Sequence, residues 1–193
     1  MNSQNYTCLE KNNYSFENYE LIPIRIQDME SIGMWRNDQI DFLRQEKSLS
    51  STDQHQYFEK IILPSFHQQF PKLILFSFLE NSRLIGYGGF VNINWNEKIS
   101  EISFLIETKR SKNLLLYRND FSIFLNFLKK IACTELQFSK LFTETYDIRS
   151  VHKSILEKNE FKISKKEITT KIINKKPVDI LFHSYICSND EKM

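Results

Sequence analysis

The feature that most constrains the fold is a run of three apolar segments in the middle of the chain, separated only by short polar turns. The segments are Lys72–Leu79, Arg83–Trp95 and Ile99–Glu107, and the turns are Glu80–Ser82 and Asn96–Lys98. Turns this short leave no room for a crossover helix, so neighbouring segments can pair only antiparallel. The centre of the chain is therefore predicted to be an antiparallel meander.

Strand and helix patterns flank this meander on its N-terminal side. Helix starts are predicted where a side chain that can cap precedes apolar residues at helical spacing. In chain order we expect a loose extension (Met1–Asn18), a strand (Glu20–Ile26), a short helix capped by Asp28 and running through Asn37, a second short helix (Asp38–Gln45), and a helix capped by Ser51 or Thr52 that runs through Phe66.

On the C-terminal side the pattern alternates between helix and strand. We expect a basic loop (Lys109–Asn113), a helix (Arg118–Cys133), a strand (Lys140–Thr145), a helix (Asp147–Asn159), and a closing hairpin of Phe161–Ile172 and Val178–Ile186 around Asn174–Pro177. This order predicts a mixed α+β sheet, β-α-α-β-β-β-α-β-α-β-β. The 193 residues fit a single domain, 19–187, between an extension (1–18) and a tail (188–193).

Charge and cysteine content exclude several classes of protein. The net charge of +2 comes from scattered basic residues, which argues against nucleic-acid binding. Cys8, Cys133 and Cys187 are odd in number and widely spaced, so we expect neither a disulfide nor a zinc site. Cys133 is then a buried apolar residue in a reducing compartment, the cytoplasm. We also expect no signal peptide and no membrane-spanning segment.

Four short segments occur in an order that resembles a known family. They are Trp35-Arg36-Asn37 after the first strand, Arg83–Gly89 leading to Glu101–Phe104 in the meander, Ile155–Phe161 before the closing hairpin, and the set Lys176, Asp179 and His183 within that hairpin. The arrangement resembles the GNAT superfamily of acyl-CoA-dependent N-acyltransferases, nearest its ribosomal-protein and amino-sugar acetyltransferase branches. The resemblance spans residues 20 to 186.

The chain departs from the family pattern in two places. The family's pyrophosphate loop contains glycine, whereas Lys109–Tyr117 contains none. The family's tyrosine before the closing hairpin is Leu156 here, and the glycine that follows it is Glu160. The resemblance therefore leaves open a degenerate GNAT fold that binds a ligand or partner without catalysis.

The resemblance implies roles for three side chains in acyl transfer. Glu101 lies where family members carry a catalytic glutamate, and it is the candidate base for the amine; a strand residue without a catalytic role is the alternative. Tyr146 and His152 are candidate acids for the leaving thiolate, with Tyr117 a weaker option, and a structural role is the alternative for His152. A thiol needs little help to leave, so the acid could be dispensable.

The cofactor implied by the resemblance is acetyl-CoA or another acyl-CoA. Its phosphates would meet the cations Lys109, Arg110 and Lys112 beside a helix N-terminus, where free N–H groups favour anions; a solvated basic loop is the alternative. The backbone of Ser103–Ile106 would meet the oxyanion. The full set of implied cofactor contacts is Ser103, Phe104, Leu105, Ile106, Lys109, Arg110, Ser111, Lys112, Asn113 and Tyr117.

The candidate acceptor site combines planar rings with amide and guanidinium groups. The adjacent Gly88 and Gly89 predict a bulge or a close backbone approach, because the chain contains only 4 glycines. His55 and His67 form no metal-ligand spacing, so no metal is expected. The acceptor candidates are Trp35, Arg36, Asn37, Arg44, Tyr87, Gly88, Gly89, Asn92 and Trp95, with Asn94 nearby.

The leading hypothesis is an N-acyltransferase, most simply an N-acetyltransferase, that acts on a nucleotide-linked amino sugar in surface glycan synthesis. The sugar comes from the family resemblance alone. A second hypothesis keeps the reaction and changes the acceptor to a protein N-terminus or a polyamine. The third is the non-catalytic binding protein. We expect a small-molecule substrate, no nucleic-acid or membrane partner, and a monomer or homodimer.

Overall fold

The computed structural model describes residues 4–168, 172–173 and 176–188. The strands are β1 (Tyr14–Phe16), β2 (Tyr19–Pro23), β3 (Ile74–Glu80), β4 (Arg83–Asn94), β5 (Ile99–Ile106), β6 (Lys140–Tyr146), β7 (Lys162–Glu167), β8 (Ile172–Ile173), β9 (Lys176–Pro177) and β10 (Ile180–Ile186). The helices are α1 (Met29–Asp38), α2 (Ser51–Tyr57), α3 (Leu63–Ser65), α4 (Thr108–Lys112), α5 (Leu114–Lys130) and α6 (Ser150–Lys158). Short 3₁₀ or π turns occupy Ile26–Asp28, Ile40–Phe42, Phe58–Ile62 and Ile131–Glu135.

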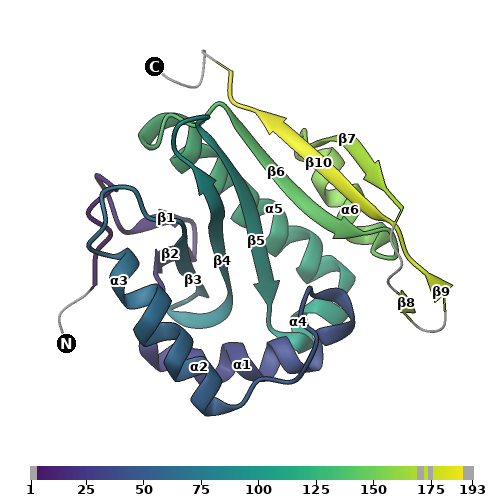
Figure 1. Cartoon of the computed structure of the whole chain (residues 1–193), viewed down its shortest axis with the longest axis horizontal. Coiled ribbons are helices and arrows are strands. Elements are labelled where there is room, and N and C mark those ends of the chain that lie inside the picture. The colour runs from purple at the N-terminus through teal and green to yellow at the C-terminus, as the bar shows by residue number, and fades with distance from the viewer. Residues whose placement is uncertain (1–3, 169–171, 174–175, 189–193) are drawn as a thin grey trace.

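One eight-stranded sheet runs through the molecule in the order β1-β2-β3-β4-β5-β6-β10-β7 (Figure 1). Only β5 and β6 pair parallel among these neighbours, and the others pair antiparallel. The predicted meander is therefore present as β3, β4 and β5, and the mixed α+β class is confirmed. A separate hairpin is formed by β8 and β9.

Helices cover both faces of the sheet, with α1 and α2 on one side and α5 and α6 on the other (Figure 1). We call these the front and back faces. Aromatic side chains pack the back face: Phe104 of β5 stacks on Phe121 of α5, and Phe78 of β3 meets Phe124 edge-on. On the front, Met29 and Ile32 of α1 are buried. The core is thus built from two layers of helices around the sheet.

The first residues are part of this core, and the prediction of a loose extension for residues 1–18 is wrong for its described part. Tyr6 is fully buried, and its hydroxyl donates to the Leu75 carbonyl at 3.0 Å and accepts from the Leu75 N–H at 2.8 Å. These bonds satisfy the backbone of β3, while β1 adds an edge strand to β2. In the sequence Tyr6 stands among polar residues, so no apolar pattern indicated that its side chain is buried. The predicted tail, from 189 onward, lies outside the described residues.

Several other elements differ from the predictions. Ser50 caps α2 in a capping box with Asp53, one residue before the predicted cap. In the range Asp38–Gln45, Asp38 ends α1 and Ile40–Phe42 form a 3₁₀ turn in place of the predicted second helix. The predicted basic loop is helix α4, and α5 begins at Leu114 because the Asn113 side chain accepts bonds from the next two free N–H groups, those of Leu115 and Leu116.

A disulfide joins Cys133 to Cys187, so the prediction of no disulfide is wrong. The two residues are 54 positions apart in the sequence and meet because β10 ends beside the segment after α5, where the Cys187 N–H bonds the Ser139 carbonyl. Cys8 is free, and burial raises the pKa of its thiol to about 11. None of the described helices is both long and apolar enough to cross a membrane.

Candidate active site

The two halves of the sheet separate between β5 and β6. These strands pair only over Ile99–Glu101 and Lys140–Phe142, and beyond Glu101 they diverge towards α4 (Figure 1). On its other edge, β5 stays paired with β4 as far as Ile106. Within the described residues, the β6-facing backbone of Ile102–Ile106 has no strand partner. The Gln39 amide donates to the Ile106 carbonyl at 2.9 Å, and the groups before it are left for a ligand.

A crevice of about 90 Å³ lies in this gap, between Glu101–Phe104 of β5 and Thr143–Tyr146 of β6. We call it the acyl crevice. Phe121 and His152 form its back wall, where the two rings stack at 4.4 Å. Phe42 and Arg44 close the front. The predicted catalytic residues Glu101, Tyr146 and His152 all line the acyl crevice, so the fold brings them together.

Two carboxylates share one guanidinium at the front of the acyl crevice. Arg44 bonds the buried Glu101 through Nη2, and its Nη1 donates to Glu144 Oε2 at 2.8 Å. Asn92 donates to the other oxygen of Glu101 at 2.7 Å. A bulge in β4 positions this amide, because the register shifts between Val91 and Asn94 and Asn92 adopts a φ of 50°. The side chain of Arg44 is 49% exposed, whereas Glu101 is 4% exposed.

The environment of Glu144 makes its carboxyl a weaker acid than a free glutamate. Burial raises the pKa of this carboxyl, and the negative charges of Glu101 and Glu167 add to the rise, while Arg44 opposes it. A carboxyl with a raised pKa beside a second carboxylate is a common arrangement for proton transfer. Glu144 was missed by the sequence analysis, although a glutamate between two threonines in a central strand was a usable signal.

A hydrogen-bonded chain of three side chains closes the back of the acyl crevice. Arg149 Nη2 donates to Tyr117 Oη at 2.7 Å, and Tyr117 Oη lies 2.6 Å from His152 Nδ1. Burial, with a contribution from Arg149, holds the pKa of His152 well below its usual range, so the imidazole is neutral and accepts from the tyrosine. Burial also raises the pKa of Tyr117, which keeps its proton.

A second cavity of about 200 Å³ continues from the acyl crevice and shares Phe42, Arg149 and His152 with it. It lies between the start of α5, with Ser111, Leu114 and Tyr117, and the start of α6. Together the two cavities form a path from the carboxylates to the α4–α5 junction.

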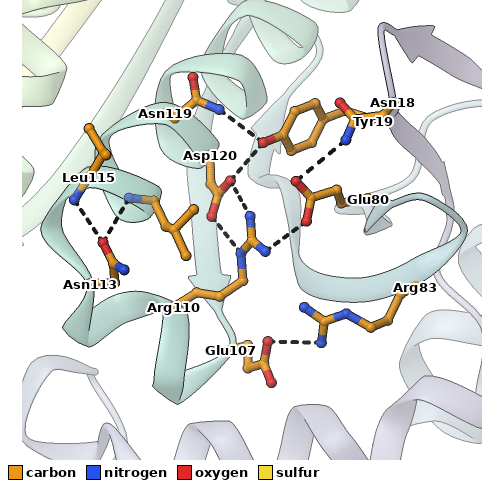
Figure 2. A network of polar contacts seen from close by, with 11 residues as sticks. Asn18, Tyr19, Glu80, Arg83, Glu107, Arg110, Asn113, Leu115, Asn119 and Asp120 are labelled. Atoms are coloured by element: carbon orange, nitrogen blue, oxygen red, sulfur yellow. Dashed lines mark hydrogen bonds and ion pairs between the residues drawn. The ribbon is translucent and has the colours of Figure 1, made fainter.

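The predicted phosphate cluster is broken by the burial of Arg110. Figure 2 shows its guanidinium between Asp120, bonded at 2.7 and 2.8 Å, and Glu80, at 2.8 Å. The expectation that Arg110 faces a ligand is therefore corrected: its donors are used inside the protein. Lys109 and Lys112 remain exposed on α4. The Asn113 cap occupies two of the N–H groups at the start of α5 (Figure 2).

The predicted acceptor residues divide into two groups. Arg44 and Asn92 meet at Glu101, whereas Trp35 is buried in the core and Trp95 packs on Phe138 and donates to the Pro71 carbonyl at 2.7 Å. The Asn37 amide holds the backbone of Leu49 at 2.8 and 2.9 Å. Trp35, Asn37 and Trp95 thus have structural partners away from the acyl crevice, contrary to the prediction.

Gly88 and Gly89 are sites of close backbone approach, as predicted. A Cβ on Gly88 would lie 2.1 Å from the Ser103 carbonyl oxygen, and one on Gly89 would lie 2.1 Å from that of Ile74. The φ of Gly89 is +148°, which side-chain-bearing residues rarely adopt. Besides Glu144, the residues of the acyl crevice that were missed include Phe42 and Thr143, which had no distinctive signal, and Arg149, a basic residue at the start of a predicted helix.

Comparisons with known proteins agree on one family. A family model described as an acetyltransferase (GNAT) domain matches residues 21–182. A search of curated protein sequences finds no match. Similar solved structures include a spermidine N-acetyltransferase from Vibrio cholerae in complex with CoA and spermine (TM-score 0.75, 15% identity, covering 88% of this chain and 96% of that one).

Two further structures are similar over nearly the whole chain. An N-acetyltransferase from Staphylococcus aureus Mu50 has a TM-score of 0.71 and 15% identity, covering 89% of this chain and 100% of the other. A ribosomal-protein-S5-alanine acetyltransferase from Vibrio fischeri has a TM-score of 0.69 and 13% identity, covering 93% and 98%. At these identities the similar structures show the fold alone. The family model, which matches residues 21–182, shows the family. The chain therefore belongs to the GNAT acetyltransferases, enzymes that transfer an acyl group from acetyl-CoA to an amine.

Proposed function

We propose that the acceptor is a cationic amine whose ammonium group binds between Glu101 and Glu144, where the Arg44 guanidinium now lies. The observation that carries this proposal is the pair of carboxylates sharing one half-exposed cation where the sheet divides. Arg44 is the exposed partner in these ion pairs, so another cation can reach the carboxylates and take its place. The carboxylates are mostly shielded from water and need a cation in its place.

The residues of the acyl crevice fit a pantetheine thioester. Thr143 Oγ1 is buried beside the crevice and has no hydrogen-bond partner among the described residues, so it offers a polar contact to a pantetheine amide. The edge of β5 that faces β6 beyond Glu101, which has no strand partner among the described residues, offers donors for the oxyanion. When bound, the cofactor supplies a thioester carbonyl for the amine to attack. Lys109 and Lys112 are the exposed cations near the α4–α5 junction that remain for its phosphates.

Only the neutral amine attacks, so the carboxylate pair must remove a proton. We assign this step to Glu101. It is the last residue of β5 that pairs with β6, and Asn92 donates a hydrogen bond to one of its oxygens. Glu144 holds the other side of the ammonium. At the back wall, the Tyr117–His152 pair is the candidate for returning a proton to the thiolate, and Tyr146 is the second candidate.

The same geometry favours a polyamine or a similar cationic amine over a nucleotide-linked amino sugar. A diphosphate needs free cations. Arg44 faces two carboxylates, and Arg36 donates to Tyr87 Oη at 2.7 Å and to Gln45 at 3.0 Å. The spermidine acetyltransferases of the same fold act on a polyamine. The amino sugar remains the alternative that the experiment decides.

The experiment measures CoA release from acetyl-CoA with three acceptors: spermidine, a peptide with a free N-terminus, and a nucleotide-linked amino sugar. We expect the highest kcat/KM with spermidine. We also expect Glu144→Gln to raise the KM for this amine, while Glu97→Gln, in the exposed turn after β4, leaves it unchanged. Preference for the sugar nucleotide, with no effect of Glu144→Gln, would contradict the proposal.

A further inference from the structure

A larger cavity lies on the front face, next to the acyl crevice. It has a volume of about 360 Å³ and is enclosed by α1, α2 and the strands β3, β4 and β5. We call it the front chamber. Ser103 lines both the front chamber and the acyl crevice, and Val91, the cross-strand neighbour of Glu101, lines the chamber as well. The two spaces therefore meet beside the reacting groups.

The floor of the front chamber is formed by the residues around Gly89 of β4. Gly89 pairs with Leu75 on β3 and Ser103 on β5, and it lies two residues from Tyr87 and from Val91 along β4. All four of these neighbours line the chamber. A Cβ on Gly89 would lie 2.1 Å from the Ile74 carbonyl oxygen, so this position requires glycine and adds no side chain to the floor.

The inner surface of the front chamber is apolar. Met29, Ile32, Ile62 and Leu75 line it, and each is at most 3% exposed. A cavity of about 150 Å³ is enough for a benzene ring, so this one holds a chain of several carbon atoms. Burial of an apolar chain here is favourable, whereas burial of an unpaired charge is costly.

Two charged residues of opposite sign, Arg36 and Asp53, also line the front chamber. Arg36 donates to Tyr87 and Gln45, and the exposed Asp53 accepts from the Ser50 N–H at 2.8 Å and from its hydroxyl at 2.7 Å. Both charges therefore have partners already, and the deeper part of the chamber offers only apolar side chains. Burial of a polyamine cation there is costly, so the chamber suits an apolar acyl chain better than the cationic acceptor.

We propose that the front chamber binds the hydrocarbon chain of an acyl-CoA longer than acetyl, a proposal that rests on the proposed N-acyl transfer at the acyl crevice. In that reaction the amine nitrogen forms a bond to the acyl carbon and the carbon–sulfur bond breaks. The amine proton goes to the carboxylate pair, and the thiolate leaves with the electron pair and gains a proton from the back wall or from water. The chain beyond the acyl carbon passes Ser103 into the chamber.

The first test compares acetyl-, butyryl-, hexanoyl- and octanoyl-CoA at saturating spermidine. Each buried methylene contributes about 0.8 kcal/mol, so kcat/KM should rise about fourfold per methylene until the chamber is full. Binding of the same thioesters, measured by calorimetry without an acceptor, should follow the same order. A rise in binding without turnover of any thioester would support the chamber and contradict the proposed function. Tightest binding of acetyl-CoA, with progressively weaker binding of longer chains, would overturn the inference.

The second test fills the chamber from β4. Val91→Phe should reduce the ratio of octanoyl to acetyl kcat/KM by at least about tenfold, because overpacking excludes the chain. Leu84→Phe, a matched change on the same strand outside the chamber, should leave this ratio unchanged. An increase in the KM for spermidine with an unchanged chain-length ratio would assign the chamber to the acceptor and overturn the inference.

Discussion

Two arginines of this protein are each held between two carboxylates, and they differ chiefly in burial. The Arg110 side chain is 8% exposed and its partner Asp120 is fully buried, whereas the Arg44 side chain is 49% exposed. Arg110 makes two bonds to Asp120 and one to Glu80, and Tyr19 adds a bond to Asp120 at 3.2 Å (Figure 2). Arg44 makes one bond to each of its carboxylates.

The difference separates a structural ion pair from a replaceable one. Loss of a partner from a buried pair leaves an uncompensated charge in the interior, which is costly. Loss of an exposed cation can be compensated by water or by another cation. The sequence predicted that Arg110 contacts the cofactor phosphates and that Arg44 contacts the acceptor. Burial gives Arg110 a structural role instead, whereas the exposed Arg44 stays accessible to a ligand.

The largest expected effect is on stability at Arg110. Asp120→Ala should lower the free energy of unfolding by about 3–5 kcal/mol, because Arg110 keeps only Glu80. Glu144→Ala, the matched change at Arg44, should lower it by less than about 1 kcal/mol. Urea unfolding measures both. Equal losses in the two variants would remove the distinction between the sites.

The second effect is on catalysis at the Arg44 site. Glu101→Gln keeps the shape of the side chain but removes its charge and its basicity, so kcat should fall about 100-fold at neutral pH. CoA binding and the unfolding midpoint should change little. Initial rates at saturating acetyl-CoA and amine measure this effect. An unchanged kcat would exclude Glu101 as the base and shift attention to Glu144.

A smaller effect is expected when Arg44 itself is removed. Arg44→Ala frees the carboxylates, so the KM for the amine should fall by up to about fivefold, the equivalent of an exposed ion pair. The guanidinium lowers the pKa of Glu144, so its removal should raise that pKa and move the acidic limb of the rate profile to higher pH. An increase in KM would show that Arg44 binds substrate instead of competing with it.

The smallest expected effect is on stability at Glu80, the more exposed of the two carboxylates that bond Arg110. Burial alone would raise the pKa of Glu80, but the bond and charge of Arg110 outweigh it and the pKa is lowered. Its contribution is therefore complete above the unfolded value of about 4.3 and is lost as the pH falls through the lower folded value. Glu80→Gln should cost up to about 1 kcal/mol near pH 7, and this cost should shrink as the pH falls through the lowered pKa of Glu80. A cost that does not vary with pH would contradict this.

Much of the fold could be predicted because its signals are local. Apolar segments and short turns define β3, β4 and β5, and helical spacing of phenylalanines identifies α5. The disulfide could not be predicted, since its cysteines meet only through the tertiary path of β10. Tyr6 was equally hidden, because its partner, the backbone of Leu75, carries no sequence signal.

The candidate site was predictable only where the family pattern gives the position of a side chain. Glu101 and His152 followed from the family pattern and both line the acyl crevice. Arg110 did not, because the sequence gives no measure of whether a basic residue faces solvent or a buried Asp120. Glu144 joins the site only after the separation of β5 and β6 places it opposite Glu101.

The most direct test is a crystal structure of the protein with CoA and spermidine bound. The account predicts an ammonium nitrogen within hydrogen-bonding distance of both Glu101 and Glu144, with the Arg44 guanidinium displaced and the Arg110 network unchanged. A structure in which Arg44 keeps both carboxylates while the amine binds elsewhere would contradict it.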